Sequence, residues 1–425
     1  MEWAEKATPG SIASGVSSDI QLVRSGPWIP CSIPTRPGRA ADHRHWSDGT
    51  SRSTAWAWPS STYCWGSNAR SQILTGLPGV GKTVILVEFQ ELAEAHGYFH
   101  AHIDVTEDGT LAPDLAAALR RVLPAMDAKR RAGDTLRRAF GELKAFSLRI
   151  QDGTELSIDV DAISGPADSG NLGADLAGLF VELGTAAREH QTGILLTVDE
   201  LHYVDRATLE SLIVGLHRAS QLALPVVVAG AGLPTLAATT GQAKAYAERL
   251  FMFPTIGSLS EDQAVDALHH PATDEGVVWI DGALAEILRV TRCYPYFIQQ
   301  FGLQAWDVAD GPDTITADDV RRSIPLALAK LDDGFFKVRA GASTKAERRY
   351  MLAMAQIGPG PVRTAEVARI MGREPSAVTP IRESLLKRSL CFVPERGRID
   401  FTVPMFGDYM MRIGAPGAMN TIHRA

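Results

Sequence analysis

The pattern of apolar and polar positions along the chain becomes regular only near residue 71. SQILTG (71–76) has the apolar run of a short buried strand, VILVEFQELAEAHG (84–97) has helical spacing, and YFHAHIDV (98–105) predicts a second strand. A glycine-rich turn joins the first strand to the helix. Strand, glycine loop, helix and strand in this order predict an α/β domain with a parallel sheet.

Alternating helices and strands continue this domain to about residue 257. AFSLRIQDGTELSIDV (145–160) predicts a β-hairpin that turns at Asp152 and Gly153. Two fully apolar segments, GILLTVDE (193–200) and LPVVVAGAG (224–232), predict buried strands of the same sheet. The other expected elements are helices at 111–124, 130–144, 175–190 and 207–220, a helix ending near Arg249, and a short strand at 251–256.

The C-terminal part of the chain has a different pattern. From Ser260 to about Lys337 the periodicity is purely helical, which predicts a helical lid. From Thr344 to Ile413 the pattern predicts three short helices and a hairpin, as in a winged helix. The expected segments are an irregular stretch at 1–68, an α/β core at 69–257, a lid at 258–340, a winged helix at 341–413 and a tail at 414–425.

Composition adds an irregular N-terminus and an uneven charge. Residues 1–68 hold six of the eight Trp residues among Ser, Pro, Gly and Arg, without a sustained period, so we expect this segment to be poorly ordered. The net charge is −7, yet from Ser343 onward 13 Lys or Arg stand against 7 Asp or Glu, a net of +6. A basic module on an acidic body predicts an anionic partner; the alternative is a solvated basic surface.

Cysteine usage and hydropathy bear on location. The four cysteines are scattered without a C-x-x-C pair, which argues against a zinc site or a disulfide framework. No apolar run approaches the ~20 residues of a membrane span, and the first residues lack the features of a signal peptide. We therefore expect a cytoplasmic protein without a membrane partner.

The glycine-rich turn reads GLPGVGKT and matches G-x-x-x-x-G-K-[ST] at every fixed position. In such a loop, backbone N–H groups turn inward around a polyphosphate, and the next helix presents its positive N-terminus to the same anion. We expect Lys82 to neutralise charge on the β- and γ-phosphates of ATP, and the Thr83 hydroxyl to bind Mg²⁺. The residues expected to bind the nucleotide are Gly76, Leu77, Pro78, Gly79, Val80, Gly81, Lys82 and Thr83.

Two carboxylates end the apolar strand within LLTVDELH (195–202). Asp199 is placed to hold Mg²⁺ from a strand beside the phosphate loop, directly or through water. Glu200 can orient and deprotonate an attacking water, which separates water-using ATPases from most phosphotransferases. The alternative is an acidic pair that caps the next helix.

Two further positions are candidates for nucleotide chemistry. Arg249, where a helix ends before the last core strand, can reach a neighbouring subunit's nucleotide as an arginine finger, or be a helix-end arginine on the surface. Pro295 in TRCYPYFIQQFG (291–302) begins a helix between aromatic residues, which can form an apolar wall against adenine. Simple core packing of these aromatics is an equal alternative.

The C-terminal block offers candidate contacts to DNA. SAVTPIRESLLKR (376–388) is the candidate recognition helix, with Arg382 on its outward face, and CFVPERGRIDFTVP (391–404) is a hairpin whose tip carries Arg396 and Arg398. Pro380 and Glu383 count against DNA binding, and winged helices also bind proteins. The expected DNA-contacting residues are Ser376, Thr379, Arg382, Lys387, Arg396 and Arg398.

Several of these motifs together resemble one protein family. TGLPGVGKT, LLTVDELHYVDR, VAGAGLP, AYAERLF, YPYFIQ, ITADDV, FFKVR and FTVPMF are similar to segments of bacterial AAA/STAND-type ATP-binding proteins with an origin-recognition (archaeal-ATPase-like) domain. The resemblance runs from about Ser71 to Ile413. It implies a P-loop NTPase α/β fold of AAA type with a helical lid and a C-terminal winged helix. It also implies ATP and Mg²⁺ as ligands, Asp199 on the metal, Glu200 on the water and Pro295 near adenine.

The strand that ends in AGAGLP modifies the expected activity. In many AAA+ ATPases this strand ends in a polar sensor side chain, whereas Ala229, Gly230, Ala231 and Gly232 supply none. We therefore expect a slow ATPase that works as a nucleotide-gated switch coupled to the winged helix, with ATP-dependent self-association through Arg249 as an open option. The alternatives are a nucleotide-binding scaffold with little hydrolysis and a P-loop kinase.

Overall fold

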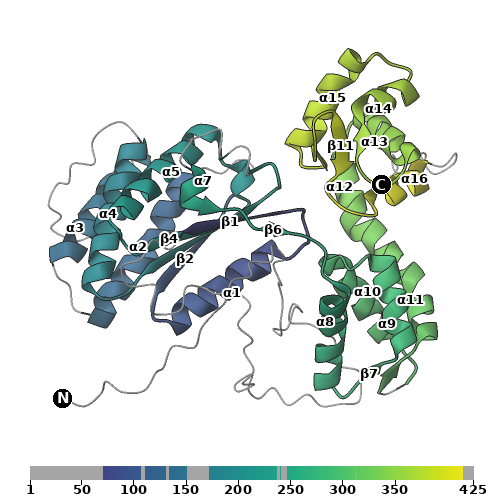
Figure 1. Ribbon diagram of the computed structural model, residues 1–425, viewed down its shortest axis with the longest axis horizontal. Helices are drawn as coiled ribbons and strands as arrows, with labels where there is room; N and C mark the ends of the chain where they lie inside the picture. The colour runs from purple at the N-terminus through teal and green to yellow at the C-terminus, as the bar shows by residue number, and fades with distance from the viewer. Residues whose placement is uncertain are drawn as a thin grey trace, which may run out of the picture.

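The computed structural model describes residues 70–106, 111–130, 134–150, 172–236, 240, 247–311 and 313–414. They form an α/β unit, a helical unit and a C-terminal unit, which follow one another along the chain (Figure 1). The segment 1–68, expected to be poorly ordered, lies outside the described residues. Among the helices that are described, none combines the length and the apolar character needed to cross a membrane.

The α/β unit is built on one parallel sheet. Its order is β2-β3-β4-β1-β5, with β6 also paired to β1, and every pairing is parallel. The carboxyl ends of β1, β3 and β4 therefore meet at one edge, where open α/β sheets place their ligands. The strands are β1 (Ser71–Gly76), β2 (Phe99–Asp104), β3 (Ile194–Asp199), β4 (Val226–Gly232), β5 (Phe251–Met252) and β6 (Thr255–Ile256).

Strand β4 lies between β1 and β3. Ala229 of β4 pairs with Gln72 of β1 on one side and with Thr197 of β3 on the other. The expectation that Asp199 ends the strand directly beside the phosphate loop is therefore wrong. Both candidate strands carry a run of apolar residues and are buried on both faces, so their own residues give no signal of which one pairs with β1.

Helices cover both faces of the sheet, and successive side chains of each strand serve different cores. Leu74 of β1 shares a buried cluster with Leu86 and Phe89 of α1 (Lys82–Ala95). Its neighbour Ile73 shares the opposite cluster, together with the helices on that face (Figure 1). This alternation is the period of two expected of a strand with both faces covered. The helices on the second face are α2 (Leu111–Arg130), α3 (Asp134–Ile150), α4 (Leu172–Glu189) and α5 (Arg206–Gln221).

The β-hairpin expected at 145–160 is wrong in its first half. Residues 145–150 continue helix α3, and 151–160 lie outside the described residues. Leu136, Ala139, Leu143 and Phe146 are all buried, and their spacing of three and four residues is that of one helix face. The short segment read alone suggested a strand, whereas the longer window carries the helical period.

The helical unit contains more than helices. It comprises α8 (Glu261–Asp274), α9 (Asp281–Thr291), α10 (Pro295–Val308) and α11 (Ala317–Lys330). Between them β7 (Val278–Trp279) and β8 (Thr314–Ile315) form a parallel pair, so the expectation of a purely helical segment is wrong. Two-residue strands are too short to interrupt a helical pattern in the sequence.

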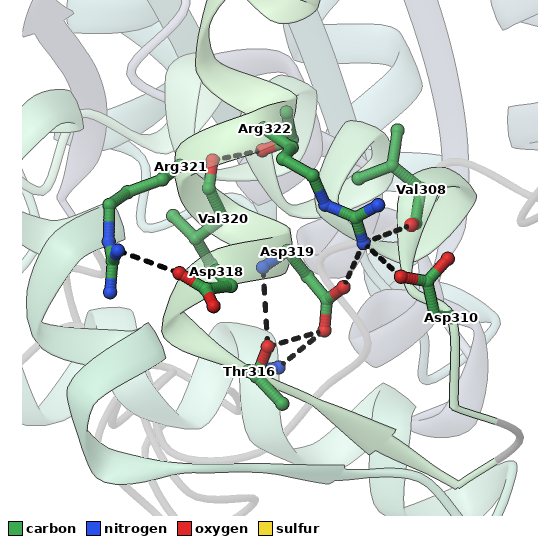
Figure 2. A network of polar contacts seen from close by, with 9 residues as sticks. Val308, Asp310, Thr316, Asp318, Asp319, Val320, Arg321 and Arg322 are labelled. Atoms are coloured by element: carbon green, nitrogen blue, oxygen red, sulfur yellow. Dashed lines mark hydrogen bonds and ion pairs between the residues drawn. The ribbon is translucent and has the colours of Figure 1, made fainter.

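The start of α11 is fixed by a network of polar side chains (Figure 2). The Thr316 hydroxyl accepts from the Asp319 backbone N–H, and the Asp319 carboxylate accepts from the Thr316 N–H at 2.8 Å. Arg322 donates to Asp319 at 2.6 Å and to Asp310 at 2.7 Å. This capping box satisfies helix-end N–H groups that have no partner inside the helix. Arg322 also donates to the Val308 carbonyl at 3.1 Å and so ties α11 to the end of α10.

From α11 the chain continues as helix into the C-terminal unit. A π-helical segment η2 (Leu331–Phe336) leads into α12 (Lys337–Gly341) without a break. The C-terminal unit then runs α13 (Lys345–Ile357), β9 (Val362–Arg363), α14 (Thr364–Ile370), α15 (Pro375–Lys387), β10 (Cys391–Phe392), β11 (Arg398–Phe401) and α16 (Phe406–Gly414). Its sheet has the antiparallel order β10-β11-β9.

The three helices and hairpin expected in the C-terminal unit are present, and α16 is an additional helix. Pro380 does not interrupt α15, which is helical from Pro375 to Lys387. Helix α16 attaches to η2: Arg412 donates to Asp332 at 2.9 Å, and the rings of Phe336 and Tyr409 stack at 5.4 Å. One continuous buried cluster thus runs from the α1 face of the sheet through α10 and η2 into the C-terminal unit.

Candidate active site

The loop between β1 and α1 has a conformation that only glycines allow. Gly79 and Gly81 have φ of +88° and +92°, in the region that L-residues rarely adopt. A Cβ on Gly76 would lie 2.4 Å from the Ile256 carbonyl oxygen, so β6 packs directly on the loop. The three glycines of the motif are therefore required by backbone geometry and by close approach.

Lys82 lies inside this loop and is 7% exposed. Its ammonium donates to the carbonyls of Gly76 and Leu77, both at 3.0 Å. Burial lowers the pKa of Lys82, although the nearby carboxylates of Glu200 and Asp199 oppose that shift. A buried cation held against the loop that precedes a helix N-terminus suits a polyphosphate anion.

Thr83 of α1 and Asp199 of β3 meet, although β1, which leads into α1, and β3 are not neighbouring strands. The Thr83 hydroxyl donates to Asp199 Oδ2 at 2.5 Å, and the Glu200 N–H donates to Asp199 Oδ1 at 2.8 Å. A hydroxyl and a carboxylate oxygen are ligands that suit Mg²⁺. Within the described ranges, no cluster of three or more His, Cys, Asp or Glu can hold a metal ion by itself. A Mg²⁺ ion here would take its remaining ligands from phosphate and water.

Glu200 follows β3 in a left-handed backbone conformation, with φ of 52° and ψ of 34°. Its side chain is 43% exposed, which leaves it open to the edge of the sheet. Burial raises the pKa of Glu200 and so does Asp199, whereas Lys82 lowers it. A non-glycine residue held at positive φ is a form of local strain that clusters at functional sites.

His202 is a site residue that the sequence reasoning missed. It lies in the 3₁₀ turn η1 (Leu201–Tyr203), and its Nδ1 is 3.3 Å from Glu200 Oε2. Burial and the nearby Lys82 lower the pKa of His202 to about 4, so the ring is neutral at pH 7. Its position two residues after Glu200, in LLTVDELH, was a usable signal.

The start of α10 packs on the phosphate loop. The Tyr296 N–H donates to the Gly79 carbonyl at 3.2 Å, and the Tyr294 hydroxyl donates to the Pro78 carbonyl. Pro295 lies between them as the first residue of α10. The structure thus brings Pro295 to the loop, and it also buries Tyr294 and Phe297 in the core, as the alternative interpretation required.

Arg339 of α12 is a second residue that the sequence reasoning missed. Its guanidinium lies 4.8 Å from the centroid of the Phe335 ring. Burial lowers the pKa of Arg339, while Tyr294, Tyr203 and Glu200 raise it. Within the described residues Arg339 has no ion pair with a carboxylate. In the sequence the FFKVR segment carries only a family resemblance, because nothing local indicates that Arg339 comes near Glu200.

The other predicted residues lie away from this cluster. Arg249 is exposed in α7 (Ala247–Leu250), and in the described part of the chain it forms no hydrogen bond or ion pair. In the C-terminal unit Ser376, Thr379, Lys387 and Arg396 are exposed, as expected of residues that contact a partner.

Two of the residues expected to contact DNA are placed differently from the expectation. Arg398 is the first residue of β11 and does not lie at the hairpin tip; it pairs with Glu395 at 2.9 Å and donates to the Pro361 carbonyl at 3.1 Å. Arg382 is half-buried, and its Nε is buried without a hydrogen-bond partner among the described residues. The helical spacing that placed Arg382 outward did not account for the hairpin that folds against α15.

Comparisons with known proteins agree with the geometry of the α/β unit. Residues 65–229 match the family model described as an AAA ATPase domain, and residues 333–410 match one described as "Domain of unknown function (DUF8462)". A search of curated proteins found no match.

Several solved structures match most of the chain at low identity. The Walker-type ATPase PABY2304 of Pyrococcus abyssi is 13% identical, with 80% of this chain and 90% of that chain covered and a TM-score of 0.51. The Thermotoga maritima RuvB Holliday junction branch migration motor is 16% identical, with coverages of 79% and 85% and a TM-score of 0.39. The Aeropyrum pernix ORC1 protein, solved in complex with DNA, is 13% identical, with coverages of 82% and 87% and a TM-score of 0.39. The chain has the parallel-sheet α/β fold of P-loop NTPases, followed by a helical C-terminal region.

Proposed function

We propose that the protein binds ATP with Mg²⁺ and hydrolyses it slowly to ADP and phosphate. The observation that carries this proposal is the convergence of a loop and a strand end at one edge of the sheet. Thr83 Oγ1 lies 2.5 Å from Asp199 Oδ2, and the buried Lys82 is close enough to both Asp199 and Glu200 for their charges to oppose its pKa shift. These are the groups that phosphoryl transfer to water requires.

Each group has one role in the proposed reaction. The loop N–H groups and Lys82 hold the β- and γ-phosphates, and a Mg²⁺ ion on Thr83 and Asp199 would neutralise phosphate charge. Glu200 accepts a proton from water as the water oxygen forms a bond to the γ-phosphorus. The bond between that phosphorus and the β–γ bridging oxygen breaks, and ADP keeps the bridging oxygen. The raised pKa of Glu200 makes it a better proton acceptor than an ordinary carboxylate.

Release of phosphate from ATP in a single turnover tests this proposal. Glu200→Gln removes the proton acceptor and keeps the shape, so release should fall by about 10²-fold or more. Glu91→Gln, an exposed glutamate on α1, is the matched control and should leave release unchanged. Bound ATP without any release in the wild type would indicate a nucleotide-binding scaffold. Formation of ADP without free phosphate, with the γ-phosphoryl group recovered on a second molecule, would indicate a kinase.

The proposed output of the site is the C-terminal unit. Tyr296, bonded to the phosphate loop, packs on Phe335 with ring centroids 4.8 Å apart, and Phe336 stacks on Tyr409 of α16. Arg339 lies on the same helical connection, and its positive charge lowers the pKa of Glu200. We propose that Arg339 binds the terminal phosphate, so that ATP and ADP favour different positions of α12. The π-helical η2 supports this role, since such segments are frequent at functional sites.

We further propose that the C-terminal unit is a winged helix that binds DNA. The order of elements supports it, with α15 as the helix that enters a groove and the β10–β11 turn beside it. Lys387 and Arg396 are exposed, and this part of the chain is basic. Binding to a duplex that falls steeply with salt supports the proposal. Binding that is absent or does not depend on salt would instead favour a protein as the partner of the C-terminal unit.

Self-association is the last part of the proposed function. Arg249 is exposed at the end of α7, next to β5 at the edge of the sheet, so a neighbouring subunit's nucleotide is within its possible reach. Mass measured by light scattering should rise when ADP is replaced by a non-hydrolysable ATP analogue. An unchanged mass would leave Arg249 without a catalytic role.

A further inference from the structure

The end of β4 lacks a polar side chain, and an imidazole lies beside it. A Cβ on Gly232 would lie 3.3 Å from the His202 backbone N and 3.5 Å from its Nδ1. The His202 side chain is 9% exposed, so it is held inside the site and does not extend into solvent. The absence of a side chain at Gly232 therefore makes room for His202.

The Nδ1 atom of His202 is oriented toward Glu200. It lies 3.3 Å from Glu200 Oε2, yet it is fully buried and makes no well-aligned hydrogen bond to a described residue. A buried polar atom without a partner costs about 1–3 kcal/mol. The Glu200 side chain is 43% exposed and has room to move, so a small rotation would give Nδ1 its partner.

We propose that His202 is the positioning residue for Glu200. Its Nδ1–H donates to Glu200 Oε2 and holds the carboxylate toward the attacking water when ATP is bound. It does so in place of the polar side chain that β4 does not supply at Gly232. This inference rests on the proposed hydrolysis of ATP.

The surroundings of the ring support this role. His202 is neutral at pH 7, so it carries a single N–H, and Nδ1 is the nitrogen that faces a hydrogen-bond acceptor. The Tyr203 ring lies 4.3 Å from the imidazole and limits its rotation. Main-chain contact completes the arrangement, because the Tyr203 N–H donates to the Glu200 carbonyl at 2.9 Å and closes the turn.

The test compares three variants in single-turnover hydrolysis and in ATP binding by equilibrium titration. His202→Ala should lower the rate constant of hydrolysis by roughly 10–100-fold, a range typical of lost orienting partners, and leave the Kd for ATP unchanged. His202→Asn should recover most of the rate, because its amide nitrogen occupies the place of Nδ1. His217→Ala, a histidine on α5, is the control and should behave as the wild type. A wild-type rate in His202→Ala, or equal losses in the Ala and Asn variants, would overturn the inference.

A second position tests the same idea without touching the histidine. Gly232→Ala places a methyl group against His202 and 2.8 Å from Leu236 Cδ2, so it should displace the imidazole and lower the rate in the same way. Gly257→Ala adds a methyl group that meets nothing within 4 Å and should have no effect. Wild-type hydrolysis in Gly232→Ala contradicts the inference, even if His202→Ala fails to fold. If the wild type itself does not hydrolyse ATP, the proposed function is refuted. This outcome differs from failure of the inference about His202, in which the wild type hydrolyses ATP and the variants keep the wild-type rate.

Discussion

Replacing Phe336 with Ala should separate the C-terminal unit from the nucleotide site. Phe336 is 0% exposed and is surrounded by other rings, with centroid distances of 5.3 Å to Phe335, 5.8 Å to Phe406 and 5.4 Å to Tyr409. Truncation of a buried Phe costs about 3–5 kcal/mol. We expect about 4 kcal/mol, because four neighbouring rings, Phe297 included, cannot easily collapse into the cavity.

The assay is hydrogen exchange followed peptide by peptide, with and without ATP. In the wild type, ATP should protect the peptides of the α/β unit and also those of α13 to α16, because binding stabilises whatever is coupled to the bound state. In Phe336→Ala only the α/β unit should gain protection. Val338→Ala is the matched control, since Val338 is 70% exposed on the same helical connection.

Two results would refute this reasoning. A loss of less than about 1 kcal/mol in urea unfolding would mean that the ring cluster does not stabilise the junction. If ATP protects α13 to α16 in Phe336→Ala as strongly as in the wild type, then Phe336 does not couple the nucleotide site to the C-terminal unit.

Three further predictions test the loop, the imidazole and the basic turn. Gly79→Ala should weaken ATP binding more than Gly97→Ala does. Both glycines have positive φ, but only a Cβ on Gly79 meets α10, 3.1 Å from Tyr296 Cβ. Equal losses of affinity in the titration would mean that backbone strain alone, without the contact to α10, accounts for the effect. The pKa of His202 falls from 6.5 to about 4 on folding, so its contribution to stability is present above pH 6.5 and is lost as the pH falls toward 4, by up to about 3 kcal/mol. His202→Phe should flatten this part of the pH profile of urea unfolding, and an unchanged profile would contradict the assigned shift. Arg396→Ala should lower the slope of log affinity for DNA against log salt concentration by about 1. Arg398→Ala should change this slope less, because Arg398 is already paired with Glu395. The reverse order in fluorescence anisotropy would contradict the proposed placement of the β10–β11 turn on DNA.

Local chemistry was predictable from the sequence, and pairing in space was not. The glycine loop, Lys82, Thr83 and the Asp199–Glu200 pair could be found because a strand, a tight turn and a helix start lie within a few residues of one another. The order of the strands was not accessible, since β3 and β4 are both apolar-rich and are buried along their whole length. Nor was Arg339, whose place in the site depends on a helix that begins more than two hundred residues after the loop.

Two of the errors have physical origins that the structure identifies. The hairpin assigned to residues 145–160 came from a short window in which polar and apolar residues happened to alternate, although Phe146 continues the buried face of α3. Arg398 was assigned to the hairpin tip because charged residues favour exposed positions, but Glu395 was three residues away to pair with it. Side-chain pairing of this kind depends on the register of the turn, which the sequence pattern does not define.

The hydrogen bond between the Tyr296 N–H and the Gly79 carbonyl gives the molecule a built-in reporter. The first N–H groups of a helix have no partner inside that helix, so they ordinarily exchange quickly with solvent. At the start of α10 this amide is instead secured by a different domain. Its exchange rate therefore measures how often the start of α10 leaves the loop, a quantity that can be followed at one amide in the unmutated protein.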